Sequence, residues 1–194
     1  MRCFVALRPD DAARERLAAV AREQQRRVPR ARAMCAENLH LTLAFIGELD
    51  EARAARVAAA LDALPVENFA WTLDAVGAFD RARVLWAAGA DCEPLSQLAR
   101  RARSLLDALH VPYDRKPFVA HVTLLRGLTR GDARHAAAPI APPVTWRADR
   151  PRLLCSVHRE GRLRYEPFVP AVTEGAHFGP DQILANRPLT KHDA

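Results

Sequence analysis

The chain has 194 residues, of which 49% are hydrophobic and 27% are charged, and its formal net charge is +6. These values are typical of a soluble globular protein that buries a core in one compact domain or two small lobes. They exclude a membrane-spanning chain, because no apolar stretch approaches the roughly 20 residues that a span requires. The basic charge suits an anionic partner such as RNA, although arginine-rich helix surfaces would give the same excess.

The four cysteines are widely spaced and form no C-x-x-C pair: Cys3, Cys35, Cys92 and Cys155. They predict neither a zinc knuckle nor a secreted disulfide framework, and we expect them in or near the core. The apolar run at residues 1–7 is too short for a signal peptide, so we interpret it as a first strand in a cytoplasmic protein.

The first half of the chain alternates predicted strands and helices. A helix is expected over residues 11–27, opened by Pro9-Asp10-Asp11 and ended by Pro29. A second helix runs from Asp50-Glu51 to about Leu64 and stops at Pro65. Between the two helices, residues 38–47 form a short apolar run that ends in glycine, which is typical of a buried strand.

The second half begins with two predicted strands at residues 69–78 and 83–88. An apolar stripe at helical spacing predicts a helix over 93–109, and a second apolar run at 119–127 predicts a strand. Residues 132–150, rich in Ala, Pro and Arg, are expected to be mostly loop. Two final strands, 152–158 and 162–168, flank the hairpin turn Arg159-Glu160-Gly161, and the tail from 172 is expected to be extended or poorly ordered.

One tetrapeptide occurs twice, as His-Leu-Thr-Leu at 40–43 and as His-Val-Thr-Leu at 121–124, each time inside an apolar run that ends in glycine. Residues i and i+2 of a strand point to one face. His40 therefore shares a face with Thr42, and His121 with Thr123, while the intervening apolar residues (Leu41, Leu43, Val122 and Leu124) face a core.

The order of elements predicts an α+β fold with antiparallel sheets and helices outside them. Because the motif and its surroundings repeat, we expect two pseudo-symmetric lobes, each with an antiparallel sheet and outer helices, and both motifs lining a central cleft. Residues 1–171 would form this single bilobal domain, with 172–194 as a tail.

Two facing His-x-Thr strands suit the hydrolysis of a cyclic phosphodiester. In-line attack needs a base on one side of phosphorus and an acid on the other, and histidine can serve as either near neutral pH. The hydroxyls of Thr42 and Thr123 can donate hydrogen bonds to the non-bridging oxygens. Arg126 is a further candidate phosphate contact, although strict alternation puts it on the core face unless the strand twists or ends there.

Other interpretations of the histidines stay open. A single His-x-Thr strand would more simply carry a hydrogen-bonded structural histidine. Zinc binding is the other alternative, but no His-x-His or nearby Cys, Asp or Glu cluster accompanies either motif, so we expect no metal and no cofactor.

Together these residues resemble the 2H phosphoesterase superfamily and, within it, the LigT-like RNA 2′,3′-cyclic phosphodiesterases, also called 2′-5′ RNA ligases. Besides the two motifs, the resemblance includes residues 2–7 and 38–48, Arg83-Val84-Leu85-Trp86, Lys116-Pro117-Phe118 and Gly161-Arg162-Leu163-Arg164-Tyr165. One departure is Ala120, where the family often has proline.

The resemblance implies a bilobal α+β fold and hydrolysis of an RNA 3′-terminal 2′,3′-cyclic phosphate to a 2′-phosphomonoester. It implies that His40 is the proton donor and His121 the proton acceptor, a choice that two near-identical motifs do not decide. Attack by an RNA 5′-hydroxyl would instead give a 2′-5′ linkage. The expected partner is an RNA or oligonucleotide with a cyclic phosphate end, bound by a monomer that contacts no membrane. A small nucleotide cyclic phosphate as substrate, or a non-catalytic nucleotide- or RNA-binding module, are the alternatives.

Overall fold

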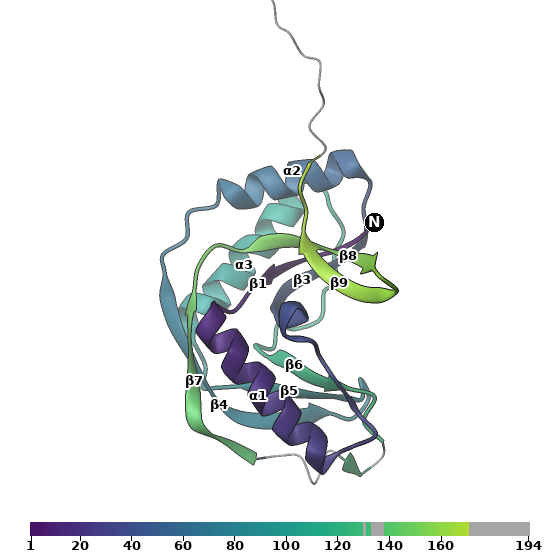
Figure 1. Cartoon of the computed structure of the whole chain (residues 1–194). Coiled ribbons are helices and arrows are strands. Elements are labelled where there is room, and N and C mark those ends of the chain that lie inside the picture. The colour runs from purple at the N-terminus through teal and green to yellow at the C-terminus, as the bar shows by residue number, and fades with distance from the viewer. Residues whose placement is uncertain (130, 133–137, 171–194) are drawn as a thin grey trace, which may run out of the picture.

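The computed structural model describes residues 1–129, 131–132 and 138–170 (Figure 1). In these residues the chain forms, in order, β1 (Arg2–Leu7), α1 (Asp11–Arg27), β2 (Arg32–Ala33), the 3₁₀ helix η1 (Ala36–Asn38), β3 (Leu41–Glu48), α2 (Glu51–Asp62), β4 (Phe69–Phe79), β5 (Val84–Ala88), α3 (Glu93–Ala108), β6 (Val122–Arg126), β7 (Ala138–Ala148), β8 (Arg152–Arg159) and β9 (Arg162–Pro167). The tail expected at 172–194 lies outside the described residues.

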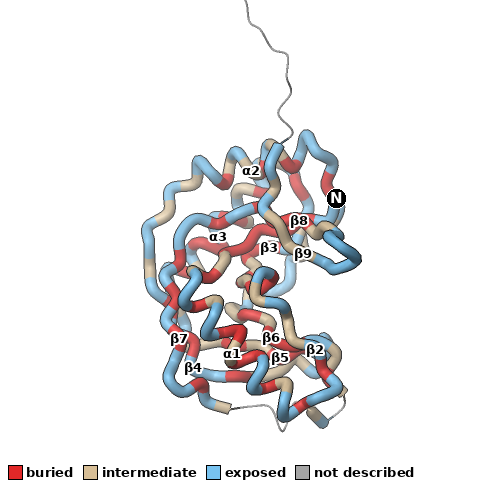
Figure 2. The backbone as a smooth tube through the Cα atoms, in the orientation of Figure 1, coloured by how far each residue is buried: buried red, intermediate tan, exposed pale blue. Residues whose placement is uncertain are grey.

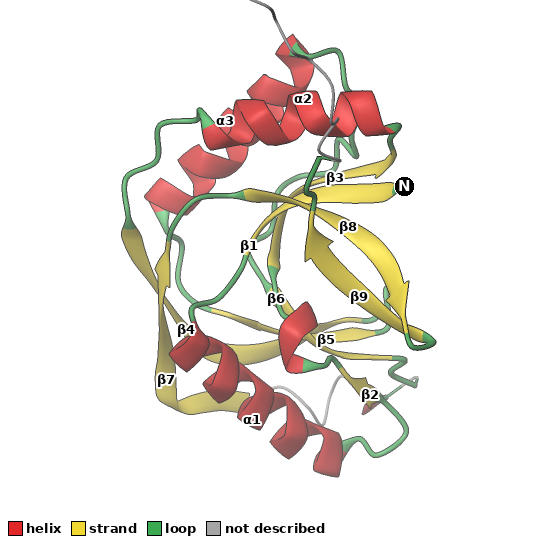
Figure 3. Ribbon diagram, turned by 45° about the horizontal axis from the view of Figure 1, so that its top comes forward, coloured by secondary structure: helices red, strands yellow, loops and turns green. Residues whose placement is uncertain are grey.

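The strands form one antiparallel sheet in the order β7-β4-β5-β6-β3-β1-β8-β9, with β2 beside β6. The sheet divides into two halves between β3 and β6, which are joined by the single residue pair Leu41 and Val122. One half has β3, β1, β8 and β9, and the other has β7, β4, β5 and β6 with the short β2 beside β6. The halves curl toward one another in Figure 3. The predicted α+β fold with two antiparallel lobes is confirmed, and the structure adds that hydrogen bonds connect the lobes into one curved sheet.

The helices cover the outer faces of the two halves. α1 packs against β6 and β7, whereas α2 packs against β8 and α3 against β3. Local capping explains where the first two helices start: the Asp10 carboxylate accepts from the Ala13 N–H at 2.8 Å, and the Asp50 carboxylate accepts from the Arg53 N–H at 2.8 Å. All three predicted helices are confirmed, with ends within two residues of those expected.

The core lies between these helices and the sheet (Figure 2). Leu41, Leu43, Val122 and Leu124 are each at most 1% exposed, which confirms that the apolar residues of both motif strands face inward. Cys3 and Cys155 are also buried, whereas Cys35 is exposed and accepts a hydrogen bond from Arg164, so its expected place in the core is wrong.

Residues 138–148, expected to be mostly loop, form the long strand β7. Three prolines in this segment argued against a strand, yet β7 is an edge of the sheet, where a missing N–H costs no ladder hydrogen bond. Its pairing with β4 is also irregular near Leu73. The alternating burial of Val144, Trp146 and Ala148 shows the strand period that the prolines obscured.

The final hairpin is confirmed, and its turn has the backbone that a two-residue connection requires. Glu160 and Gly161 have φ angles of 51° and 74°, both positive, which is the geometry that suits the twist of antiparallel strands. No helix in the described part of the chain is long and apolar enough to cross a membrane.

Candidate active site

Both motif strands carry the same irregularity at the same position. Leu43 is skipped in the pairing of β3 with β1, and Leu124 is skipped in the pairing of β6 with β5. Each leucine lies three residues after its motif histidine, and each is a bulge that reverses the alternation of side chains beyond it. The residue five positions after each histidine thereby returns to the histidine's face.

Those two returning residues are Phe45 after His40 and Arg126 after His121. Arg126 is exposed and lines a pocket together with His40 and Thr42. Strict alternation would place Arg126 on the core face, and this is wrong because the bulge at Leu124 reverses the alternation. The two halves of the site differ here, since one presents an aromatic ring and the other a guanidinium.

His40 lies immediately before β3, half-buried, with its ring fixed on several sides. Its Nδ1 lies 2.6 Å from the Asn38 carbonyl. The Phe4 ring centroid is 4.8 Å away and the edge-on Tyr165 ring is 5.0 Å away. Burial, together with the nearby positive charge of Arg126, lowers the pKa of His40 from 6.5 to about 4.

His121 lies immediately before β6 in the matching position. Its Nδ1 is 2.8 Å from the Val119 carbonyl, and the Phe79 ring meets the imidazole edge-on at 5.1 Å. Burial lowers the pKa of His121 below its usual value, and Arg126 lowers it further. Arg126 is thus close enough to both histidines to disfavour the charged form of each.

The two imidazoles share one tautomer. A backbone carbonyl can only accept, so Nδ1 of each neutral ring carries the proton and donates it to the carbonyl two residues earlier. The Nε2 atom of each ring is then left to take or give a proton. The site therefore holds two imidazoles in fixed orientation, one from each half of the sheet, and each has an Nε2 atom that is chemically able to accept or donate a proton.

Two neighbouring pockets contain these groups. The first, of about 650 Å³, is lined by His40, Thr42, Phe45 and Arg126 among others. The second, of about 270 Å³, is lined by His121 and again by Thr42 and Phe45. The antiparallel pairing of Leu41 with Val122 explains this, because it sets Thr42 across from His121 and His40 across from Thr123.

Thr123 lies on the expected face, half-buried and paired in register with Trp86 of β5, but it lines neither of these two pockets. The structure thus brings His40, Thr42, His121 and Arg126 to the pocket walls.

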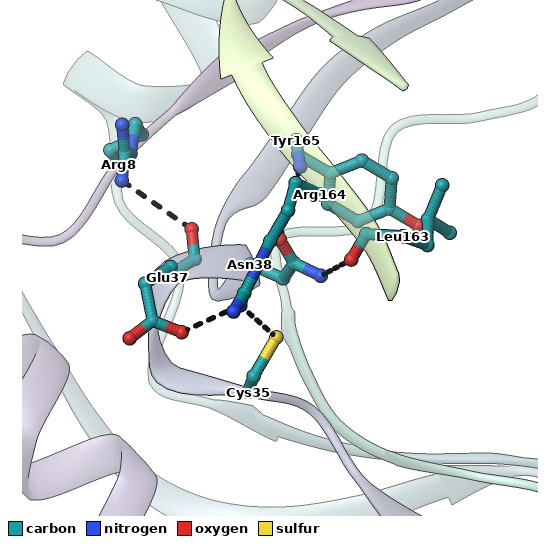
Figure 4. A network of polar contacts seen from close by, with 7 residues as sticks. All are labelled: Arg8, Cys35, Glu37, Asn38, Leu163, Arg164 and Tyr165. Carbon is teal, nitrogen blue, oxygen red and sulfur yellow. Dashed lines mark hydrogen bonds and ion pairs between the residues drawn. The ribbon is translucent and has the colours of Figure 1, made fainter. Parts of the chain in front are cut away.

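Asn38 is a residue of this site that the sequence analysis did not single out (Figure 4). Its side chain is 5% exposed and bonds the backbone of β9 twice: Nδ2 donates to the Leu163 carbonyl at 2.9 Å, and Oδ1 accepts from the Tyr165 N–H at 3.0 Å. Because β9 is an edge strand, Asn38 completes its unpaired side. The same residue supplies the carbonyl that orients His40.

Surface pairs around Asn38 hold η1 against the hairpin. Arg164 pairs with the Glu37 carboxylate at 3.0 Å, and Arg8 donates to the Glu37 carbonyl at 3.4 Å (Figure 4). Within the described residues, no group of three or more His, Cys, Asp or Glu side chains is arranged to hold a metal ion.

Comparisons with known proteins identify the family. Residues 7–86 match the family model described as LigT-like phosphoesterase. The RNA 2′,3′-cyclic phosphodiesterase of Escherichia coli (strain K12) is 34% identical over 141 residues, which cover 71% of this chain and 77% of that protein. This chain belongs to the LigT-like phosphoesterase family.

Further matches agree with this membership. The RNA 2′,3′-cyclic phosphodiesterase of Archaeoglobus fulgidus is 35% identical over 129 residues, covering 65% of this chain and 72% of that protein. The crystal structure of E. coli LigT with 3′-AMP aligns at a TM-score of 0.73 and 29% identity, covering 87% of this chain and 95% of that one. The resemblance to the LigT-like family and the α+β fold predicted from sequence are both confirmed.

Proposed function

We propose that this LigT-like phosphoesterase hydrolyses the 2′,3′-cyclic phosphate at the 3′ end of RNA to a 2′-phosphomonoester. The curated relatives are named RNA 2′,3′-cyclic phosphodiesterase. The observation that carries the proposal is the pair of histidines, each with Nδ1 bound to a backbone carbonyl, on the two halves of one curved sheet. That pair supplies one proton-transfer group for each side of a phosphorus atom.

In this proposal the anionic phosphate lies beside Arg126, with the Thr42 and Thr123 hydroxyls as further donors to its oxygens. Nε2 of His121 takes a proton from water as the water oxygen bonds to phosphorus. The bond from phosphorus to the 3′ oxygen breaks, and that oxygen takes a proton from Nε2 of His40. The assignment of His40 as acid and His121 as base follows the family resemblance.

Because the pKa of His40 is low in the free protein, the bound substrate is expected to promote the protonation of this histidine. In the free protein, burial and Arg126 hold the His40 pKa near 4, so its ring is neutral at pH 7. A bound phosphate monoanion beside the ring opposes the effect of Arg126 and favours the imidazolium. We therefore expect substrate binding to raise the His40 pKa and to bring the proton that the leaving oxygen needs.

The test is incubation of an oligonucleotide ending in a 2′,3′-cyclic phosphate, with and without EDTA, beside a mononucleotide 2′,3′-cyclic phosphate. We expect a 2′-phosphate product at equal rates with and without chelator, and a higher kcat/KM for the oligonucleotide. Loss of turnover in EDTA would reject the metal-free mechanism. Faster use of the mononucleotide would assign a small cyclic nucleotide instead, and tight binding without product would indicate a binding module.

We expect residues 1–171 to act as one domain, in a cytoplasmic monomer. Light scattering of the purified chain tests the monomer, since a mass of twice 21.5 kDa would show a dimer.

A further inference from the structure

Two of the four cysteines, Cys3 and Cys155, lie side by side although they are 152 positions apart in the sequence. Cys3 is on β1 and Cys155 is on β8, and the two are direct partners in the register of these antiparallel strands. Their Sγ atoms are 2.7 Å apart, and the residues are 0% and 4% exposed. The reaction proposed at His40 and His121 uses neither thiol.

The backbone at this pair suits a covalent bond between the two sulfurs. Directly opposed residues of antiparallel strands have Cα atoms about 4.5 or 5.5 Å apart. A disulfide spans Cα–Cα distances of about 4.4–6.8 Å. Because the two side chains already meet, the bond can form without a large movement of either strand. The other two cysteines are placed differently: Cys35 is exposed and accepts from Arg164, and Cys92 lies at the start of α3.

One thiol of the pair is more reactive than the other. The hydrogen bond between the two sulfurs lowers the pKa of Cys155 and raises the pKa of Cys3. The thiolate is the nucleophilic form of cysteine, so Cys155 is the expected nucleophile. Cys155 Sγ also lies 3.6 Å from Met1 Sδ, and Cys3 Sγ lies 3.5 Å from the Met1 carbonyl oxygen. Met1 is 44% exposed, so the pair lies directly behind a residue that solvent reaches.

A bond at this position would fasten the strand that presents Phe4 to the site. Phe4 follows Cys3 on β1, and its ring centroid lies 4.8 Å from that of His40 and 5.1 Å from that of Tyr165. The two thiols belong to the core, whereas Phe4 lines the pocket of His40. The pairing of β1 with β3 is irregular between Cys3 and Phe4. A covalent link to β8 would therefore hold β1 at the point where its other neighbour holds it least regularly.

We infer that Cys3 and Cys155 are an oxidation site, at which a peroxide forms a disulfide that clamps β1 to β8. The Cys155 thiolate attacks one oxygen of hydrogen peroxide, the O–O bond breaks, and a sulfenic acid and hydroxide form. The hydroxide takes up the proton that the Cys155 thiol released. The Cys3 sulfur then bonds to the sulfenic sulfur, loses its proton, and displaces the sulfenic oxygen as water. The two thiols are oxidised to one disulfide, and the peroxide is reduced to two molecules of water.

The experiment compares the reduced protein with the same protein after treatment with hydrogen peroxide. Each sample is unfolded, its free thiols are alkylated, and its peptides are identified by mass. We expect a peptide pair that joins Cys3 to Cys155, is lighter by two hydrogens than the free pair, and disappears after dithiothreitol. Because the link joins residues 152 positions apart, it restricts the unfolded chain, so Tm should rise by about 10 °C.

Two variants separate this pair from the exposed thiol. Cys35→Ala should keep both the linked peptide and the rise in Tm, and Cys155→Ala should lose both. The comparison of reduced and oxidised wild type needs no variant, so it decides the question even if Cys155→Ala does not fold.

Three results would overturn the inference: both thiols remain open to alkylation after peroxide, Cys155 is recovered as a sulfinic acid, or the link forms and Tm does not change. None of these measurements depends on phosphodiester hydrolysis. Failure of the oxidation site therefore leaves the proposed function standing, and an inactive protein that forms the link would reject the proposed function alone.

Discussion

Replacing Asn38 by alanine should both destabilise the protein and impair catalysis, because one residue links the fold to the orientation of His40. Its amide makes two hydrogen bonds, to the Leu163 carbonyl at 2.9 Å and from the Tyr165 N–H at 3.0 Å. Each such bond contributes about 1 kcal/mol, and backbone groups left unpaired add to the loss, so Asn38→Ala should lower the free energy of unfolding by about 2–4 kcal/mol.

The catalytic effect of Asn38→Ala follows from the position of its carbonyl, which accepts from His40 Nδ1. Without the side-chain hydrogen bonds of residue 38, that carbonyl should become more mobile and should hold the His40 ring less well. A poorly oriented His40, the proposed acid, should lower kcat roughly 10–100-fold. Urea unfolding gives the first quantity. Initial rates without denaturant, together with ¹⁵N shifts of the imidazole that report its tautomer, give the second.

The matched control is Glu37→Ala on the same 3₁₀ helix, which removes the exposed pair with Arg164. An exposed pair is worth less than about 1 kcal/mol, so this variant should stay close to wild type in stability and rate. If Asn38→Ala behaved like Glu37→Ala, or lost stability with an unchanged His40 tautomer and kcat, the role of Asn38 in orienting His40 would be refuted.

Three further predictions concern charge and packing near the histidines. Arg126→Gln should raise the pKa of both His40 and His121 in an NMR titration, because the positive charge that lowers them is removed. The same variant should raise KM, because the proposed contact between Arg126 and the phosphate is lost. Unchanged histidine pKa values would refute the influence of Arg126 on both rings. Folding lowers the His40 pKa from 6.5 to about 4, so the unfolded chain takes up the proton before the folded protein does as the pH falls. Between pH 6.5 and pH 4 the free energy of unfolding of wild type should therefore decrease by up to roughly 3 kcal/mol relative to His40→Gln. Urea-unfolding free energies of the two proteins that run parallel over this pH range would contradict the prediction. Gly77→Ala should cost about 1–3 kcal/mol in thermal or urea unfolding, because the new methyl group would overlap the Trp86 indole; wild-type stability would show that the indole has room to move.

Features that depend on nearby residues were predictable from sequence. Asp10 and Asp50 cap helices that start at the next residue, and prolines stop the chain from continuing in helix. Alternation correctly assigned the inward and outward faces at the start of both motif strands. The family and fold predicted from these patterns are confirmed, whereas the roles of His40 and His121 stay predictions.

Features that depend on pairing partners were not predictable from local pattern. The bulge at Leu124 exists only relative to β5, so alternation alone misplaced Arg126. Asn38 bonds residues that follow it by 125 and 127 positions, and no local spacing signals such contacts. The prolines in residues 138–148 argued against a strand, yet they do not disrupt β7 because this strand lies at the edge of the sheet.

The bulges also bring into the site a position at which the two halves differ, whereas the two tetrapeptides themselves are nearly identical. Five residues after the histidine, one half has Phe45 and the other has Arg126. In the proposed function the guanidinium of Arg126 would give the phosphate a charged partner, whereas the Phe45 ring offers only an apolar surface. The two halves are thus related by fold but differ in chemistry at the position that the bulges bring into the site.

We propose that His40 and His121 form one split active site. The direct measurement is ³¹P NMR of a 2′,3′-cyclic-phosphate oligonucleotide incubated in EDTA with wild type, His40→Ala or His121→Ala, each shown to be folded by circular dichroism. We expect a 2′-phosphomonoester from wild type and a loss of at least about 100-fold in rate for either variant. A 3′-phosphate product, or turnover near the wild-type rate by either folded variant, would contradict it.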